Sequence, residues 1–270
     1  MNQIELHKKI DSLLLKNPDD AEQKEVSYLI SANEDAHYYF FAKADERWLD
    51  WLWGNGSLDV IKEKAEDPTR YGYRTPELNY LARISEKVPI KVVDIMQEVP
   101  VSKAILNPEV IDRFLWICST LPAEQLARIV QKILNEKWIP LMGAFNQWGF
   151  EYEKMLQVLV DAKDYKSILV LAEAILAVRP KEEKAPNRIT TDNPFFFDGL
   201  SYTKVFKHLI AVDDEYTEQA LKLTTEVISR IVQLGDKAES NEMFSFQEIF
   251  YLFDVDFFSL TSSKEEHLSG

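Results

Sequence analysis

Apolar residues recur every three to four positions along most of the chain, a spacing that predicts amphipathic helices. The helical stretches form four successive pairs, and a short break separates the two helices of each pair. The breaks fall near Pro89, Pro122, Asp164 and Asp214. Thr75-Pro76 marks a helix start, because a polar residue caps a helix and proline fits its first turn. The pattern therefore predicts helical hairpins, one of which buries Leu126, Ile129 and Ile133.

The spacing of the breaks indicates a loose repeat. Successive breaks lie 33, 42 and 50 residues apart. Tetratricopeptide repeats need a fixed period of about 34 residues and ankyrin repeats a Thr-Pro-Leu-His turn, and neither pattern occurs here. We expect an all-α fold, an irregular HEAT-like α-solenoid of stacked helical hairpins. Residues 1–66 are expected to form an N-terminal helical cap, residues 67–243 the helical-repeat solenoid, and residues 244–270 an aromatic C-terminal segment with a polar tail, all within one continuous domain.

Four aromatic and proline-containing motifs lie in the first third of the chain. They are Tyr38-Tyr39-Phe40-Phe41, Arg47-Trp48-Leu49 with Leu52 and Gly54, Tyr73-Arg74-Thr75-Pro76-Glu77, and Tyr80-Leu81-Ala82-Arg83. These motifs resemble a helical region of long multidomain bacterial proteins, several of which are suspected of acting in phage defence. Members of that group often carry a tryptophan where this chain has Thr75. The resemblance concerns packing and implies a helical solenoid beside an effector or nucleotide-binding module in a longer polypeptide.

The charge of the chain bears on its partners. It has 45 acidic and 31 basic residues, a net charge of -14. Proteins bind nucleic acid largely by neutralising phosphates with lysine and arginine, so this charge argues against a nucleic-acid partner. A local basic edge at Arg70, Arg74 and Arg83 keeps nucleic-acid binding as an alternative, because a patch can matter more than the total.

The sequence contains no motif for catalysis or cofactor binding. It has 8 glycines and lacks the Gly-Lys-Ser/Thr of a phosphate-binding loop. Its four histidines are isolated in sequence, and its one cysteine, Cys118, lies in an apolar run that predicts burial. We expect a noncatalytic protein with no cofactor and no metal. The alternative is an enzyme with a metal or nucleotide site assembled across the repeats from acidic residues and His37 or His208.

An acidic run near the N-terminus superficially resembles a nuclease motif. Asp19 and Asp20 are followed by Glu22 and Lys24. Nuclease carboxylates border a sheet, whereas these residues precede a predicted helix, where aspartate accepts hydrogen bonds from free backbone amides. We expect them to cap that helix.

Three tryptophans crowd one short predicted helix. Asp45 is expected to cap this helix, which contains Trp48, Trp51 and Trp53. Their spacing cannot place all three side chains on one face, so one is expected to point out of the core, where it could anchor a protein partner. The alternative is that all three pack between neighbouring helix pairs.

Phenylalanines gather at two further places. Phe195, Phe196 and Phe197 lie in the longest connection, which either packs over the repeats or contacts a partner. Residues 244–258 carry six more, which do not follow one helical stripe. They are Phe244, Phe246, Phe250, Phe253, Phe257 and Phe258. We expect this segment to dock against a neighbouring domain or a second copy of the chain, or else to fold back and cap the fourth hairpin.

Together these features predict a noncatalytic protein-interaction scaffold or sensor region, and the resemblance implies that it belongs to a bacterial defence protein. Solenoids present extended surfaces that suit protein recognition. The expected partner is another protein or a downstream domain of a longer chain, and self-association is an alternative. The apolar runs are too short to span a bilayer, and the first residues lack the features of a signal peptide. We therefore expect a cytoplasmic protein that does not associate with membranes.

Overall fold

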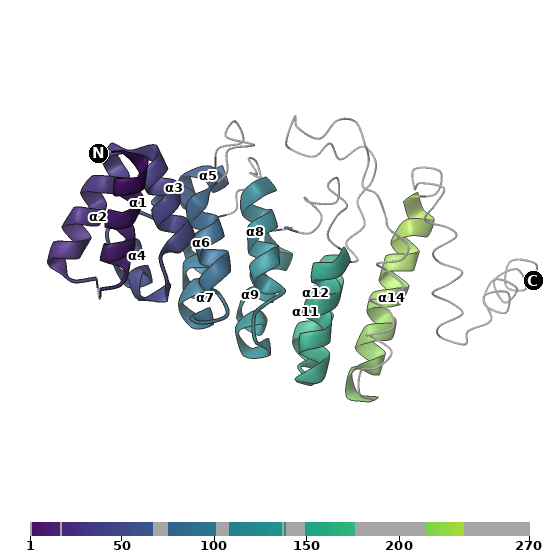
Figure 1. Ribbon diagram of the computed structural model, residues 1–270. Coiled ribbons are helices and arrows are strands. Elements are labelled where there is room, and N and C mark those ends of the chain that lie inside the picture. The colour runs from purple at the N-terminus through teal and green to yellow at the C-terminus, as the bar shows by residue number, and fades with distance from the viewer. Residues whose placement is uncertain are drawn as a thin grey trace, which may run out of the picture. The chain divides into compact units, whose positions relative to one another are not determined.

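The computed structural model describes most of the first two thirds of the chain and one helix beyond it. The described residues are 2–16, 18–66, 75–100, 108–136, 138, 149–175 and 214–234. They form twelve α-helices and one short 3₁₀ helix, and no strand occurs among them (Figure 1). The predicted all-α class is confirmed for these residues. None of the described helices is long and apolar enough to cross a membrane.

The chain divides into two compact units, Met1–Leu121 and Pro122–Gly270. The division coincides with one of the predicted breaks and falls inside the region predicted to hold the repeats. The helices predicted as an N-terminal cap therefore share a unit with the first predicted hairpin. The predicted domain boundaries remain predictions.

Eight of the described α-helices, together with the 3₁₀ helix η1, lie in the first unit. Their bounds are α1 Gln3–Leu14, α2 Asp20–Ala32, α3 Glu34–Lys43, η1 Glu46–Trp48, α4 Leu49–Gly54, α5 Asp59–Glu66, α6 Pro76–Ile84, α7 Pro89–Glu98 and α8 Pro108–Cys118. Helices α1, α2 and α3 contact one another, and α3 contacts α6. Helix α6 also contacts α5, α7 and α8, so it links the N-terminal helices to the following ones.

Polar side chains begin the first three helices. Asn2 and Glu5 form a reciprocal capping box at the start of α1. The Asp19 carboxylate accepts hydrogen bonds of 3.0 and 3.2 Å from two backbone amides in the first turn of α2. Asn33 accepts one of 2.9 Å at the start of α3. Asp19 therefore caps a helix, as predicted.

The start of α6 differs from the sequence expectation. Thr75 precedes Pro76, but its side chain makes no capping hydrogen bond. Its hydroxyl instead accepts a hydrogen bond from Lys64 Nζ of α5 (2.6 Å), and its backbone amide donates to Glu109 Oε1 of α8 (2.8 Å). Thr75 and Lys64 are both buried. A buried ammonium needs hydrogen-bond partners, so this polar cluster joins three helices where a simple cap was expected.

Aromatic side chains form part of the core of the first unit. Phe40 and Phe41 of α3, Trp48 of η1 and Tyr80 of α6 are fully buried. The ring centroids of Phe41 and Tyr80 lie 5.8 Å apart in an edge-to-face arrangement. This geometry suits the opposite partial charges of a ring's face and edge, so it favours the contact between α3 and α6.

Four of the described helices lie in the second unit. Their bounds are α9 Ala123–Asn135, α11 Gly149–Asp161, α12 Tyr165–Ile175 and α14 Asp214–Leu234. Helices α11 and α12 form the hairpin predicted around Asp164, where Lys163 adopts the left-handed conformation with φ 55°. Helix α12 contacts α9, α11 and α14. The first helix of the fourth predicted pair lies outside the described residues.

The apolar stripe of α9 provides a test of the second unit. Leu126, Ile129 and Ile133 are fully buried, as predicted. We expect Leu126→Ala to lower the free energy of unfolding by about 2 to 5 kcal/mol, because it leaves a cavity in the core. Pro122→Ala should cost less, since Pro122 is exposed and contributes its carbonyl, which alanine retains. Urea unfolding of the full chain measures both, and equal midpoints for Leu126→Ala and wild type would contradict this packing.

Candidate protein-interaction surface

The predicted tryptophan helix consists of η1 followed by α4. Asp45 begins η1, and its carboxylate accepts a hydrogen bond from the backbone amide of Arg47 (3.1 Å). The predicted Asp45 cap is therefore present. Because α3 ends just before Asp45, the chain makes an elbow between α3 and η1 that directs the tryptophans.

Trp48 faces the core. Its side chain is fully buried and meets Phe40 edge to face, with 5.3 Å between ring centroids. Its indole Nε1 is buried and has no hydrogen-bond partner among the described residues. An unpaired buried N–H opposes folding, so the aromatic packing around Trp48 must more than offset that cost.

The other two tryptophans are partly open to solvent. Trp51 and Trp53 are both half-buried on α4. Trp51 packs edge to face on Trp48 at 5.5 Å, which holds its ring beside the core. The ammonium of Lys62 from α5 lies 4.4 Å from the ring centroid of Trp53, a cation–π contact.

Ion pairs tie α4 and α5 to α7. Lys91 Nζ lies 2.7 Å from both carboxylate oxygens of Asp50. Lys62 Nζ lies 3.6 Å from a carboxylate oxygen of Glu98 and 3.6 Å from one of Asp59. Helix α7 therefore contacts both neighbours at two points about 10 Å apart along its axis. We use the name tryptophan face for the two partly exposed tryptophans of α4 together with the charged residues of these contacts and ion pairs: Asp50, Trp51, Trp53, Asp59, Lys62, Lys91 and Glu98.

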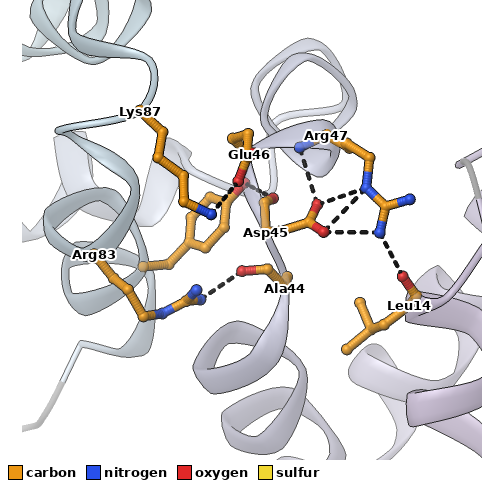
Figure 2. A network of polar contacts seen from close by, with 8 residues as sticks. Leu14, Ala44, Asp45, Glu46, Arg47, Arg83 and Lys87 are labelled. Atoms are coloured by element: carbon orange, nitrogen blue, oxygen red, sulfur yellow. Dashed lines mark hydrogen bonds and ion pairs between the residues drawn. The ribbon is translucent and has the colours of Figure 1, made fainter.

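Side chains of α6 hold the elbow between α3 and η1 through hydrogen bonds to its backbone (Figure 2). Arg83 donates hydrogen bonds from its guanidinium to the carbonyls of Phe41 (2.9 Å) and Ala44 (2.5 Å). Tyr80 donates from its hydroxyl to the carbonyl of Asp45 (3.0 Å). The last carbonyls of a helix lack partners within it, so these donors satisfy the end of α3 and fix the turn that follows. Burial raises the pKa of Tyr80 well above its ordinary value, so its hydroxyl keeps the proton that it donates.

Charged side chains complete the elbow. The Arg47 guanidinium pairs with the Asp45 carboxylate (2.7 Å) and donates to the carbonyl of Leu14, the last residue of α1 (2.9 Å). Its hydrogen bonds hold the pKa of Asp45 below the ordinary range, and Asp45 in turn raises the pKa of Arg47. Lys87 pairs with Glu46 at 3.0 Å. The pKa of Glu46 is lowered first by a hydrogen bond to its own backbone amide and then by Lys87.

The histidines of the first unit each pair with one carboxylate. His37 of α3 lies 2.6 Å from Glu77 of α6, whose side chain is buried. His7 of α1 lies 2.7 Å from Asp35 and stacks on Tyr39 with 3.7 Å between ring centroids. Among the described residues, no three His, Cys, Asp or Glu side chains gather closely enough to hold a metal ion. The contacts of His37 and His7 connect α3 to α6 and to α1.

Cys118 lies at the end of α8 and is fully buried, as predicted. Burial raises the pKa of its thiol well above the ordinary value. The nucleophilic thiolate is therefore disfavoured at neutral pH.

Several of the sequence candidates fall outside the described residues. These are Phe195, Phe196, Phe197, Phe244, Phe246, Phe250, Phe253, Phe257, Phe258, His208, Arg70 and Arg74. Arg83, the third member of the proposed basic edge, is described, and its guanidinium donates to backbone carbonyls of α3 and the following turn.

Sequence reasoning missed the partners of the tryptophans. Lys62 and Glu98 lie on α5 and α7, and no spacing within one helix links them to Trp53 on α4. One part of the contact between α6 and the elbow could be predicted. Tyr80 and Arg83 are three residues apart on one predicted helix and therefore share a face. Their acceptors are backbone carbonyls, which carry no sequence signal.

Comparison with known proteins gives no relative. No family model matches the chain, and neither a curated protein nor a solved structure matches it. The tryptophan face is therefore assigned from its own geometry.

The Asp45–Arg47 pair predicts a pH dependence of stability. Because folding lowers the pKa of Asp45, its charge stabilises the fold at pH values above the unfolded pKa of about 3.9. This contribution is lost as the pH falls through the lowered pKa of the folded state. We expect Asp45→Asn to melt below wild type at pH 7 and pH 5, and the difference to shrink under more acidic conditions.

Thermal unfolding followed by circular dichroism measures this difference. Arg47→Gln provides the control: in that background the Asp45→Asn change should lose most of its pH dependence. A difference between wild type and Asp45→Asn that stays constant down to the acid transition would show that the pair contributes nothing.

Proposed function

We propose that the chain is a noncatalytic protein-interaction scaffold or sensor region, built as an irregular HEAT-like solenoid of stacked helical hairpins. The observation that carries this proposal is the display of Trp51 and Trp53, partly exposed, on a helix that is fixed by contacts from several others. Tryptophans in such positions are frequent anchors in protein interfaces. The resemblance to multidomain bacterial proteins supports a place beside an effector module in a defence protein.

The order of helix contacts supports stacked hairpins within each unit. In the first unit, α6 contacts its hairpin partner α7 and also α8, which is the first helix of the following predicted pair. In the second unit, α12 contacts its hairpin partner α11 and also α9 and α14, the second helices of their pairs. Contacts between helices of the same rank in successive pairs are typical of solenoids, where each repeat packs on its neighbours.

The N-terminal helices have the character of a solenoid end. One stripe of α1 is buried through Leu6, Ile10 and Leu13, while most other positions of α1 are exposed and polar. Helix α2 likewise buries Val26 and Leu29, and more than half of its exposed residues are polar, although Tyr28 is exposed as well. A terminal unit with a polar outer face is what a solenoid needs to end in water. This supports the proposed role of residues 1–66 as a cap.

Rigidity supports the proposed role of the tryptophan face. Trp51 rests on the buried Trp48, and the elbow that carries both is held by Tyr80 and Arg83. A surface that is already ordered loses less conformational entropy when a partner binds. The face is therefore suited to binding another protein.

The test is capture of a partner from the native cells by the tagged full chain, compared with Trp51→Ser/Trp53→Ser. We expect a protein that co-purifies with wild type, is lost from the double variant, and binds purified wild-type chain directly. Tyr28→Ser is the matched control, because Tyr28 is an exposed aromatic residue on α2, outside the tryptophan face. Circular dichroism of each variant checks whether its helix content matches that of wild type.

Two results would contradict the scaffold proposal. One is the absence of any protein that binds wild type directly. The other is a partner that the double variant retains as well as Tyr28→Ser does.

The proposed solenoid predicts the size of the chain in solution. A compact globule of this length has a radius of gyration near ~18 Å. Because hairpins that contact only their neighbours stack along an axis, the value for a solenoid should be larger. Small-angle scattering of the monomer measures it, and a value at or below ~18 Å would remove the solenoid from the proposal.

A further inference from the structure

The partly exposed ring of Trp53 already contacts a cation of the chain itself. Lys62 Nζ lies 4.4 Å from its centroid, and the same nitrogen lies 3.6 Å from carboxylate oxygens of Asp59 and Glu98. An aromatic ring face flanked by carboxylates is complementary to an ammonium or guanidinium group. In the free chain the ammonium of Lys62 occupies this position over the Trp53 ring.

The carboxylates of the tryptophan face remain accessible despite their ion pairs. The side chains of Asp59 and Glu98 are 55% and 56% exposed, and that of Asp50 is 73% exposed. Exposed ion pairs contribute little, because water and salt screen them. Their lysines can therefore be replaced by other cations at small cost.

A cation supplied by a partner has an advantage over Lys62. Cation–π contacts and ion pairs strengthen when they are shielded from water, and a docked protein would provide that shield. Lys62 itself is about one third exposed and lies at the solvent boundary. An arginine would add a planar group that stacks on the indole and bonds a carboxylate through two N–H groups.

We propose that the tryptophan face binds a basic segment of a protein partner, with an arginine or lysine of that segment replacing Lys62 over Trp53. This rests on the proposed scaffold function and names the chemistry of its partner. Three acidic residues, Asp50, Asp59 and Glu98, lie on the face beside two lysines, and the chain as a whole carries a net charge of -14. Long-range attraction therefore favours a basic partner over an acidic one.

The experiment titrates the full chain with an acetylated and amidated peptide of three Gly-Ser-Arg repeats. Its twin carries citrulline, which keeps the shape of arginine and lacks the charge. The readout is the pair of indole ¹H–¹⁵N resonances of Trp51 and Trp53, assigned with Trp51→Phe and Trp53→Phe. We expect the arginine peptide to shift the Trp53 resonance more than the citrulline peptide does, and Trp53→Leu to weaken binding about threefold or more.

Lys62→Gln is the decisive variant, because it removes the internal competitor. It should strengthen binding of the arginine peptide about twofold or more relative to Lys8→Gln. Lys8 is an exposed lysine on α1, so that control removes the same charge away from the face. A general electrostatic effect would move both variants equally, whereas competition for Trp53 moves only Lys62→Gln.

The following results would overturn the inference that Trp53 binds a cation of the partner. Equal binding of the citrulline peptide, equal effects of Lys62→Gln and Lys8→Gln, or a Trp53 resonance that does not move would each show that Trp53 is not a cation-binding position for a partner. A glutamate version of the peptide that shifts Trp53 more than the arginine version would assign the face to an acidic partner. If capture finds a protein that depends on Trp51 and Trp53 while the peptide results are negative, the scaffold function stands and this inference fails. If capture finds no such protein, the scaffold function fails.

Discussion

Arg83 donates hydrogen bonds to backbone carbonyls at the C-terminal end of α3, where the helix itself provides no further amide donors. The last carbonyls of a helix have no amide ahead of them, and a chain that turns sharply there must find donors elsewhere. In this protein the guanidinium of Arg83 reaches the carbonyls of Phe41 and Ala44, and the Tyr80 hydroxyl reaches that of Asp45. Both donors come from α6, so the turn after α3 is held by a helix distant in sequence. A positive charge at a helix C-terminus is also favoured by the helix dipole.

The surface features of the first unit depend on this elbow. It directs Trp48 into the aromatic core, and Trp48 supports Trp51 at the boundary with solvent. Helix α4 then presents Trp53 to Lys62 of α5, while exposed ion pairs link side chains of α4 and α5 to α7. Buried packing thus fixes the backbone, and exposed ion pairs, which are individually weak, arrange the outer side chains. A partner can rearrange those outer pairs without disturbing the core.

The sequence predicted the helices well, because their signals are local. The hairpin breaks near Pro89 and Asp164 and the caps at Asp19 and Asp45 follow from the preferences of single residues. Local preferences did not predict the role of Thr75. Its hydroxyl accepts a hydrogen bond from Lys64 and does not cap the backbone amides of α6, because the buried lysine requires a partner. The spacing of the tryptophans predicted that they could not share a face and that one would point out of the core. Trp48 is buried, but two tryptophans, Trp51 and Trp53, are partly exposed rather than one. The cation over Trp53 comes from another helix and could not be read from local spacing.

Amide hydrogen exchange of Arg83→Met tests most directly whether the elbow depends on Arg83. Methionine keeps much of the apolar stem of arginine and removes its donors. We expect faster exchange of backbone amides in residues 44–54 with little change in α1 and α2, because the turn after α3 loses its hydrogen bonds while the packing of the first helices remains. Lys87→Met, which removes only an exposed ion pair with Glu46, should leave exchange in residues 44–54 close to wild type. Unchanged exchange in Arg83→Met, or equal effects of the two variants, would contradict the central role of Arg83.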